Sequence, residues 1–181
     1  MIGLKKVQKK SKNGLTIGLF NAIIQSEKRK GNKKMAKTIW FDLDGTIVDL
    51  YGVEGWLEML IAKDETPYAI AKPLLRLSAL ARVLNQLQCK GYKVGVISWL
   101  AKNSTAEYDK AVAAAKEKWL RNHLASVLFD EINIVAYGTP KQTFAKSDAD
   151  ILFDDEKPNR DAWTGVAFDA TDIMKVLKGL S

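Results

Sequence analysis

The sequence contains little cysteine and little histidine. Its only cysteine, Cys89, rules out an internal disulfide framework and fits a reducing compartment, for which the cytoplasm is the default expectation. Cys89 is expected near a helix end and is interpreted as structural. The only histidine, His123, falls near the end of another expected helix, where a surface or capping role is the better interpretation. Neither a His-rich metal site nor a phosphohistidine mechanism is therefore indicated.

Long hydrophobic runs are also missing. The apolar run from Leu15 to Ile24 is shorter than the roughly 20 residues that cross a membrane. It also lacks the longer unbroken core and the small-residue cleavage site of a signal peptide. We therefore expect no membrane partner.

The net charge of +7 is distributed unevenly along the chain. Residues 1–37 carry eleven Lys or Arg against one acid, Glu27, for +10, and residues 38–181 carry the remaining 17 basic and 20 acidic residues, for −3. Residues 1–34 are expected to be a basic leader, and residues 35–181 a mildly acidic globular domain. Three interpretations of the leader stay open: an arm that binds nucleic acid or an anionic surface, a solvated disordered tail, or a non-native segment. The third is favoured, with Met35 as the natural start, because a strand is expected almost immediately after it.

Alternating patterns predict an α/β fold. With 181 residues and 47% hydrophobic content, the chain suits one domain with a sizeable core. Short β-rich runs alternate with longer helical patterns, which is typical of a parallel sheet covered by helices on both faces. The expected strands are Thr38–Asp42, Lys93–Ser98, Glu131–Tyr137, Ala149–Phe153 and Gly165–Phe168. The prediction is a Rossmann-like three-layer sandwich around a central parallel sheet of about five strands.

Apolar residues at helical spacing predict three helices. The first carries Leu77, Leu80, Ala81, Leu84 and Leu87 on one face and ends before a C-terminal cap at Gly91. The second is expected to start at Ser104, with Glu107 completing a capping box. Its inner face is expected to hold Tyr108, Val112, Ala115 and Trp119. The last covers Asp169–Leu180, with acids at its start and lysines toward its end.

Polar residues follow four of the expected strands. In an open parallel α/β sheet, ligands bind beyond the carboxyl ends of the strands. The first strand leads into Asp42, Asp44, Gly45 and Thr46, the second ends at Ser98, the third runs toward Lys141, and the fourth ends at Asp154 and Asp155. Several carboxylates, a hydroxyl group and an amine are therefore expected to converge on one crevice.

This order of motifs resembles that of the haloacid dehalogenase superfamily. Its phosphatase members show Asp-x-Asp-Gly-Thr after the first strand, Ser or Thr after the second, then a Lys and paired acids. All four elements occur here in that order, over roughly residues 38–170. The resemblance implies a three-layer fold with a helical cap and a magnesium-dependent phosphomonoester hydrolase that works through an aspartyl-phosphate.

The resemblance and the chemistry of phosphoryl transfer suggest roles for the acids. Asp42 would attack phosphorus, and Asp44 would protonate the leaving oxygen and then deprotonate the hydrolytic water. Magnesium prefers hard oxygen ligands, which Asp42, Asp154, Asp155 and the backbone carbonyl of Asp44 would supply. Alternatively, the pair Asp154 and Asp155 could cap a helix that starts near Pro158.

The remaining site residues would bind the phosphate and the substrate. Ser98, with the backbone amide of Trp99, would hydrogen-bond a phosphoryl oxygen, although its hydroxyl could instead satisfy a backbone group. Lys141 would neutralise the phosphate and the nucleophile. It is preferred because it follows a strand, over the neighbouring lysines Lys116, Lys118 and Lys146. Thr46 and Tyr51 complete the expected substrate-binding set.

The segment between Thr46 and Leu74 has room for only a small helical cap, expected at about residues 47–74. A small cap would admit a bulky substrate such as a nucleotide or a nucleic-acid end, with Tyr51 or Trp56 available for base stacking. For Trp56, packing against the core is the favoured interpretation. The segment from Asp155 to Trp163 loosely resembles deoxynucleotidase-like and polynucleotide-phosphatase-like members, which favours nucleotide or nucleic-acid phosphomonoesters over sugar phosphates.

Two other functions stay open. A phosphotransferase would pass the phosphoryl group from Asp42 to an alcohol instead of water. A nucleic-acid-binding protein would act through the basic leader, with binding that weakens steeply with salt and is lost when residues 1–34 are deleted. The sequence indicates no oligomeric state.

Overall fold

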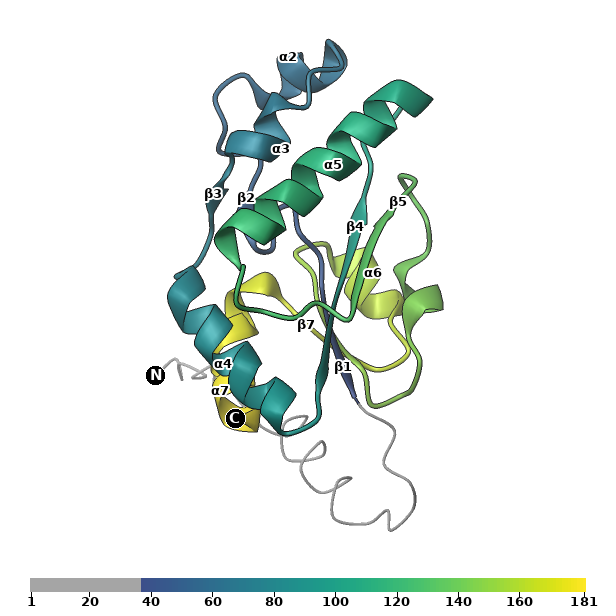
Figure 1. Cartoon of the computed structure of the whole chain (residues 1–181). Coiled ribbons are helices and arrows are strands. Elements are labelled where there is room, and N and C mark those ends of the chain that lie inside the picture. The colour runs from purple at the N-terminus through teal and green to yellow at the C-terminus, as the bar shows by residue number, and fades with distance from the viewer. Residues whose placement is uncertain (1–36) are drawn as a thin grey trace, which may run out of the picture. The chain divides into compact units, whose positions relative to one another are not determined.

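Five parallel strands form the centre of the molecule. The computed structural model describes residues 37–181, so the expectations for the basic leader and for Met35 lie outside the described residues. The strands are β1 (Thr38–Phe41), β4 (Lys93–Trp99), β5 (Glu131–Val135), β6 (Ile151–Phe153) and β7 (Val166–Phe168). They pair in the order β5-β4-β1-β6-β7, parallel throughout (Figure 1). The predicted sheet is confirmed, with strand ends displaced by one or two residues.

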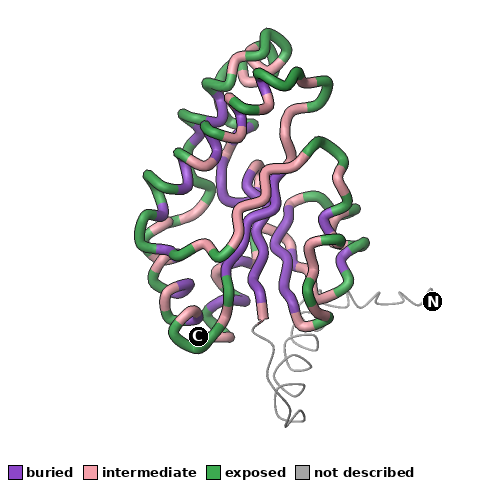
Figure 2. Tube along the Cα trace, turned by 45° about the vertical axis from the view of Figure 1, so that its right-hand side comes forward, coloured by how far each residue is buried: buried purple, intermediate pink, exposed green. Residues whose placement is uncertain are grey.

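The sheet is buried on both faces because its central strands are almost wholly apolar. In Figure 2 these strands lie in the buried interior, and most exposed residues lie on the helices and loops around them. Trp40 in β1 lies beside Gly95 in β4, where an added Cβ would come within 2.4 Å of the indole ring. Only glycine leaves room for this ring, which packs with Ile97, Leu152 and Trp163.

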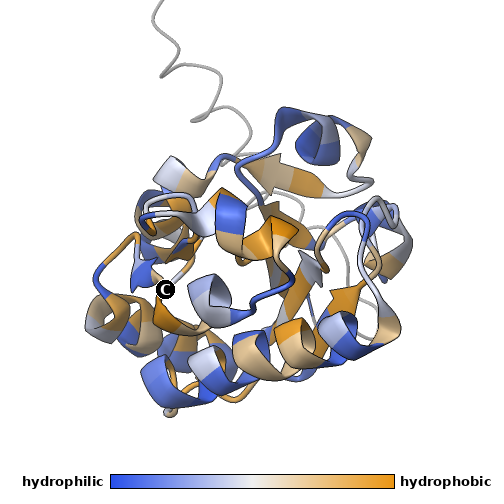
Figure 3. Cartoon of the chain, turned by 90° about the horizontal axis from the view of Figure 1, so that it is seen from above, coloured by the Kyte–Doolittle hydropathy of each residue, from blue (hydrophilic) through white to orange (hydrophobic). Residues whose placement is uncertain are grey.

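Helices cover both faces of the sheet, which confirms the predicted three-layer fold. One side carries α4 (Leu77–Cys89), α5 (Ala106–His123) and α7 (Ile173–Leu180), the last preceded by the 3-10 turn η2 (Ala170–Asp172). The other carries the 3-10 turn η1 (Lys141–Phe144) and α6 (Lys157–Ala162). Seen from above, hydrophobic strands lie at the centre and the helices carry both hydrophobic and hydrophilic residues (Figure 3).

The helix ends match the sequence in two cases and differ in one. Gly91 follows α4 with a φ of 90°, a left-handed conformation that favours glycine. Asp169 accepts a hydrogen bond from the backbone N–H of Thr171 at the start of the last helical segment. The expected capping box of Ser104 and Glu107 is wrong by one residue, because the hydroxyl of Thr105 caps α5 by accepting from the N–H of Tyr108. Adjacent Ser and Thr residues are both good caps, so local chemistry could not choose between them.

A small insert follows the first strand, as the predicted fold class requires. It begins and ends with the antiparallel ribbon of β2 (Val48–Asp49) and β3 (Lys72–Pro73), and between them lie α2 (Trp56–Ile61) and α3 (Thr66–Ile70). Leu50 and Tyr68 of the insert pack against Tyr108, Val112 and Ala115 of α5. The insert therefore rests on α5, beside the carboxyl ends of the strands (Figure 1).

Within residues 37–181, no helix is both long enough and apolar enough to cross a membrane.

Candidate active site

The carboxyl edge of the sheet brings the two acidic motifs together. Asp42 directly follows β1, and Asp154 directly follows the neighbouring strand β6. The backbone N–H of Asp42 donates to the carbonyl of Phe153, so the two strands remain paired up to these acids. Both side chains are buried, with 5% of Asp42 and none of Asp154 exposed.

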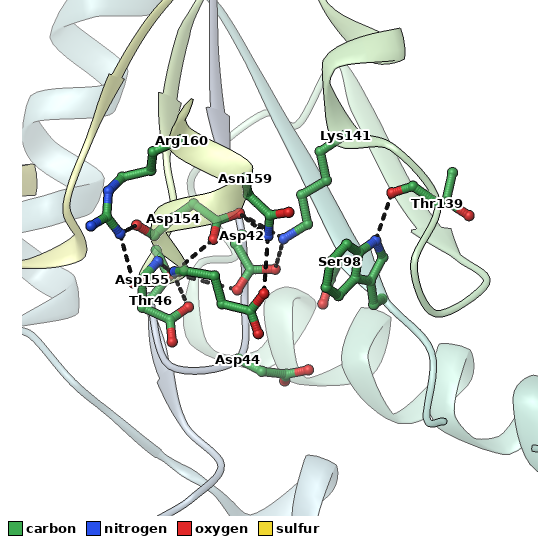
Figure 4. Close-up of polar contacts among 12 residues, drawn as sticks. Asp42, Asp44, Thr46, Ser98, Thr139, Lys141, Asp154, Asp155, Asn159 and Arg160 are labelled. Carbon is green, nitrogen blue, oxygen red and sulfur yellow. Dashed lines mark hydrogen bonds and ion pairs between the residues drawn. The ribbon is translucent and has the colours of Figure 1, made fainter. Parts of the chain in front are cut away.

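Lys141 joins these two carboxylates (Figure 4). Its Nζ lies 2.7 Å from Oδ1 of Asp42 and 2.7 Å from Oδ2 of Asp154. It comes from η1, whose place in the crossover between β5 and β6 carries it to the edge of the sheet. Burial opposes its charged form, but the two carboxylates outweigh burial and raise the pKa of Lys141. The ammonium group therefore stays charged between two acids.

Asp42 is held in an environment that disfavours its charge. Burial is the largest cause that raises the pKa of Asp42, from 3.8 to about 7. The attraction of Lys141 lowers it, whereas the nearby charges of Asp154 and Asp44 raise it. One lysine therefore offsets only part of the repulsion within this group of acids.

Asp154 is fixed by residues that the sequence analysis did not identify. The side-chain amide of Asn159 donates to both of its carboxylate oxygens at 3.2 Å, and the N–H of Glu156 donates at 2.9 Å. Arg160 donates to the backbone carbonyls of Asp154 and Asp155. Asn159 and Arg160 lie in α6, four and five residues after Asp155. Their place in the helix that follows the acid pair was the sequence signal for them.

Thr46 connects the first acidic motif to the second. Its hydroxyl accepts from the N–H of Asp155 and lies 3.4 Å from Oδ2 of Asp42 and 3.3 Å from Oδ1 of Asp155. Only 1% of Thr46 is exposed. The structure therefore places this predicted substrate-binding residue among the carboxylates, buried from solvent.

Gly45 lets the two motifs approach each other. Its φ of 75° is left-handed, and an added Cβ would lie 2.4 Å from Oδ2 of Asp155. Any larger residue would push the second motif away. The left-handed turn at Gly45 thus also allows the close approach of Asp155.

Ser98 and Asp44 share a partner that the sequence analysis passed over. Ser98 is fully buried at the end of β4. Its hydroxyl accepts a hydrogen bond from Nζ of Lys116 at 2.9 Å, and the same Nζ lies 2.5 Å from Oδ2 of Asp44. The sequence pattern favours Lys141, which follows a strand, over Lys116, which falls on a helix. The helical spacing of Lys116 from Val112, on the buried face of α5, was the signal that could have found it.

A cavity of about 510 Å³ opens above the carboxylates. Tyr51 and Trp56 line it from the insert, with ring centroids 5.1 Å apart in an edge-on arrangement. Trp99 at the end of β4 and Tyr137 in the loop after β5 also line it, with centroids 5.2 Å apart. Asp42 lies among its lining residues. The expectation that Trp56 packs into the core is not met, because Trp56 is only partly buried and packs on Tyr51.

Tyr51 lies close to the acids. Burial is the largest cause that raises the pKa of its phenol, followed by the charges of Asp155 and Asp44. The side chain is 49% exposed. Tyr51 therefore lines the cavity beside the carboxylates and remains half exposed to solvent.

The acidic cluster suits a divalent cation in its charge and in its donor atoms. Four carboxylates gather here against two ammonium groups, from Asp42, Asp44, Asp154, Asp155, Lys116 and Lys141. Hard carboxylate oxygens are what magnesium prefers. Within the described residues no three carboxylate, histidine or cysteine side chains are already arranged around a metal position. The magnesium site therefore stays a prediction, which the excess of negative charge favours.

Comparison with known proteins adds little to this geometry. No family model matches the sequence. No curated protein matches it either. Among solved structures, the chain is similar to a D,D-heptose 1,7-bisphosphate phosphatase from Burkholderia thailandensis, with a TM-score of 0.45, 16% identity and 70% of each chain covered. What this chain does is therefore inferred from its own side chains.

Proposed function

We propose that this protein is a magnesium-dependent phosphomonoester hydrolase in which Asp42 accepts the phosphoryl group. The observation that carries the proposal is the position of Lys141, with Nζ 2.7 Å from both Asp42 and Asp154 at the carboxyl edge of the sheet. A carboxylate nucleophile and an anionic phosphate repel each other. A buried lysine reduces this repulsion, and a second acid that could help hold a metal ion would reduce it further.

In the first step, a carboxylate oxygen of Asp42 bonds to phosphorus while the bond from phosphorus to the leaving oxygen breaks. Asp44 gives its proton to that oxygen, so an alcohol departs. The cavity reaches both residues, which lets one substrate contact both. Splitting the displacement in two lowers each barrier.

In the second step, water bonds to phosphorus and gives a proton to Asp44. The bond from Asp42 to phosphorus breaks, which returns the carboxylate and releases inorganic phosphate. Ser98 and Lys141 hold the phosphoryl oxygens through both steps. If an alcohol replaced water here, the same residues would catalyse phosphotransfer.

Magnesium, when bound, would supply charge neutralisation on the phosphate and the nucleophile. Asp42, Asp154 and Asp155 would hold it, with the backbone carbonyl of Asp44. Asn159 supports this assignment, because its amide group fixes the orientation of the Asp154 carboxylate.

The cavity favours a substrate with a flat aromatic part, such as a nucleotide or a nucleic-acid end. Its volume suits a small ligand, and aromatic rings line two of its sides. Stacking on such rings contributes about 1 to 3 kcal/mol per base. Lys63 and Lys102 also line the cavity and would attract a phosphate-bearing substrate. A reducing compartment such as the cytoplasm fits the exposed thiol of Cys89.

A phosphatase screen tests this proposal. Nucleotides, oligonucleotides with 3′ or 5′ phosphates, and sugar phosphates are assayed with magnesium and with EDTA. We expect magnesium-dependent release of phosphate, fastest from the nucleotide group, and none from Asp42→Asn. Wild-type turnover by Asp42→Asn would show that the mechanism is wrong.

A further inference from the structure

Lys116 is a buried lysine for which the catalytic steps above have no role. It lies on α5 with 1% of its surface exposed. Its Nζ donates to Oδ2 of Asp44 at 2.5 Å, to the hydroxyl of Ser98 at 2.9 Å and to the carbonyl of Trp99 at 2.5 Å. An ammonium group has three hydrogens, and all three are used.

The fold alone does not call for a lysine at this position. Its neighbours on the same face of α5 are apolar, including Val112, Ala115 and Trp119. An apolar side chain would fill such a place without the cost of burying charge, and buried ion pairs seldom add stability over well-packed apolar residues. Two of the partners of Lys116 are proposed to act on the substrate, which suggests that this lysine serves the reaction.

The contact with Asp44 uses one carboxylate oxygen. Lys116 holds Oδ2, and Asp44 lines the cavity with 15% of its side chain exposed. Oδ1 is not held by Lys116, so it is the oxygen that would take up the proton and pass it to the leaving oxygen. A fixed carboxylate avoids the loss of rate that follows when a catalytic group is displaced by about 1 Å.

The contact with Ser98 fixes a second group. Because Lys116 donates to the hydroxyl oxygen, the hydroxyl hydrogen is left to point at another acceptor. A phosphoryl oxygen that reaches this buried hydroxyl would be such an acceptor. The ring of Tyr68, from the insert, lies 4.8 Å from Nζ and covers the lysine on the side of α3.

We propose that Lys116 is a positioning residue that orients Asp44 for proton transfer and Ser98 for phosphate binding. The inference rests on the proposed phosphatase function and adds a residue to it. Lys116 is not among the residues that line the cavity, so its proposed action is through Asp44 and Ser98 and not on the substrate itself. Replacing Lys116 should therefore lower kcat most for substrates whose leaving oxygen needs a proton.

A pair of phosphate esters separates positioning from general damage. Benzyl phosphate releases an alcohol that must be protonated, whereas p-nitrophenyl phosphate releases a phenolate that is stable without a proton. General acid catalysis contributes about 10²- to 10⁴-fold. For Lys116→Met we expect kcat for benzyl phosphate to fall about 100-fold, and kcat for p-nitrophenyl phosphate to fall only a few-fold. The loss of Ser98 orientation should raise KM for both esters alike.

Two further variants give matched controls. Lys118→Met, on the exposed side of the same helix, should leave both esters unaffected. Asp44→Asn should show the same selective loss of kcat for benzyl phosphate as Lys116→Met. The double variant should lose little more than either single variant, because both changes impair the same proton transfer. Losses that multiply in the double variant would overturn the inference.

Equal losses of kcat for both esters in Lys116→Met would assign the lysine a structural role and overturn the inference, as would no loss. Circular dichroism checks folding. If Lys116→Met does not fold, Lys116→Gln keeps a hydrogen-bonding side chain without the charge and should show the same selectivity. Absence of turnover by the wild type with either ester would instead contradict the proposed function itself.

Discussion

Asp42 and Asp150 are buried carboxylates at opposite ends of the same sheet, and their surroundings differ. Asp150 accepts from four neutral donors: the N–H groups of Thr38 and Lys146, the indole of Trp40 and the hydroxyl of Ser147. β1 begins at Thr38 and ends just before Asp42. Asp42 instead meets Lys141 and two further acids.

This difference is the one expected between a structural acid and the proposed nucleophile. The charge of Asp150 is spread over fixed hydrogen bonds that need nothing from outside the protein. The charge of Asp42 is destabilised by burial and by its neighbours, and would be relieved by a metal ion or by transfer to phosphorus. The two acids should therefore respond in opposite ways to substitution.

Asp42→Asn should abolish activity and spare the fold. Without the proposed nucleophile we expect turnover to fall by at least about 10⁴-fold, as for other residues that form covalent intermediates. Lys141 retains Asp154 as a partner, so the variant should unfold at a urea concentration no lower than the wild type. Steady-state kinetics and urea denaturation check both parts. Unfolding of Asp42→Asn under native conditions would contradict the distinction between Asp150 as the structural acid and Asp42 as the proposed nucleophile.

Asp150→Ala should do the reverse. Removing this carboxylate leaves buried donors of Trp40 and Thr38 without a partner, so we expect a loss of about 3 kcal/mol in the free energy of unfolding. Activity per folded molecule should stay at the wild-type value, because Asp150 lies at the far end of β1. Urea denaturation and kinetics below the unfolding midpoint measure the two effects. A variant with wild-type stability and a reduced kcat would contradict the assignment of a structural role to Asp150.

Asn159→Ala should weaken the metal site without touching the nucleophile. Its amide group orients both oxygens of Asp154, and loss of such support costs about 10- to 100-fold in metal affinity. We expect about tenfold weaker magnesium binding by calorimetry, with kcat restored at saturating magnesium. Exposed Asp161→Ala on the same helix serves as the control. Unchanged magnesium affinity in Asn159→Ala would contradict a supporting role of Asn159 in the metal site.

The smallest expected effect is a pH dependence of stability that Asp42 carries. Its pKa is 3.8 in the reference state and about 7 in the folded protein, so between these values the unfolded chain releases the proton first. Stability contributed by Asp42 therefore falls as the pH rises through this window. In EDTA, the stability of Asp42→Asn relative to the wild type should therefore rise between pH 5 and about pH 8. Urea denaturation at the two pH values measures this, and an equal difference at both would refute it.

Strand ends could be predicted from the sequence because they follow short apolar runs. Asp42 and Asp154 are the first residues after such runs, so their meeting at one edge follows from parallel pairing alone. Lys141 was found because it follows a strand. Lys116 and Asn159 could not be predicted in the same way, because they reach the site from helices. The direction of a long side chain on a helix depends on how the helix packs. The cap at Thr105 was missed for a local reason, since Ser104 offers the same chemistry.

The most direct measurement is the site of phosphorylation during turnover. A substrate identified in the screen is mixed with the protein and magnesium, the reaction is stopped in acid within its first turnover, and the peptides are mapped by mass spectrometry. The proposal predicts one phosphoryl group on Asp42 in the wild type and none in Asp42→Asn. Steady turnover with no phosphoryl group on Asp42, or with the group on another residue, would contradict it.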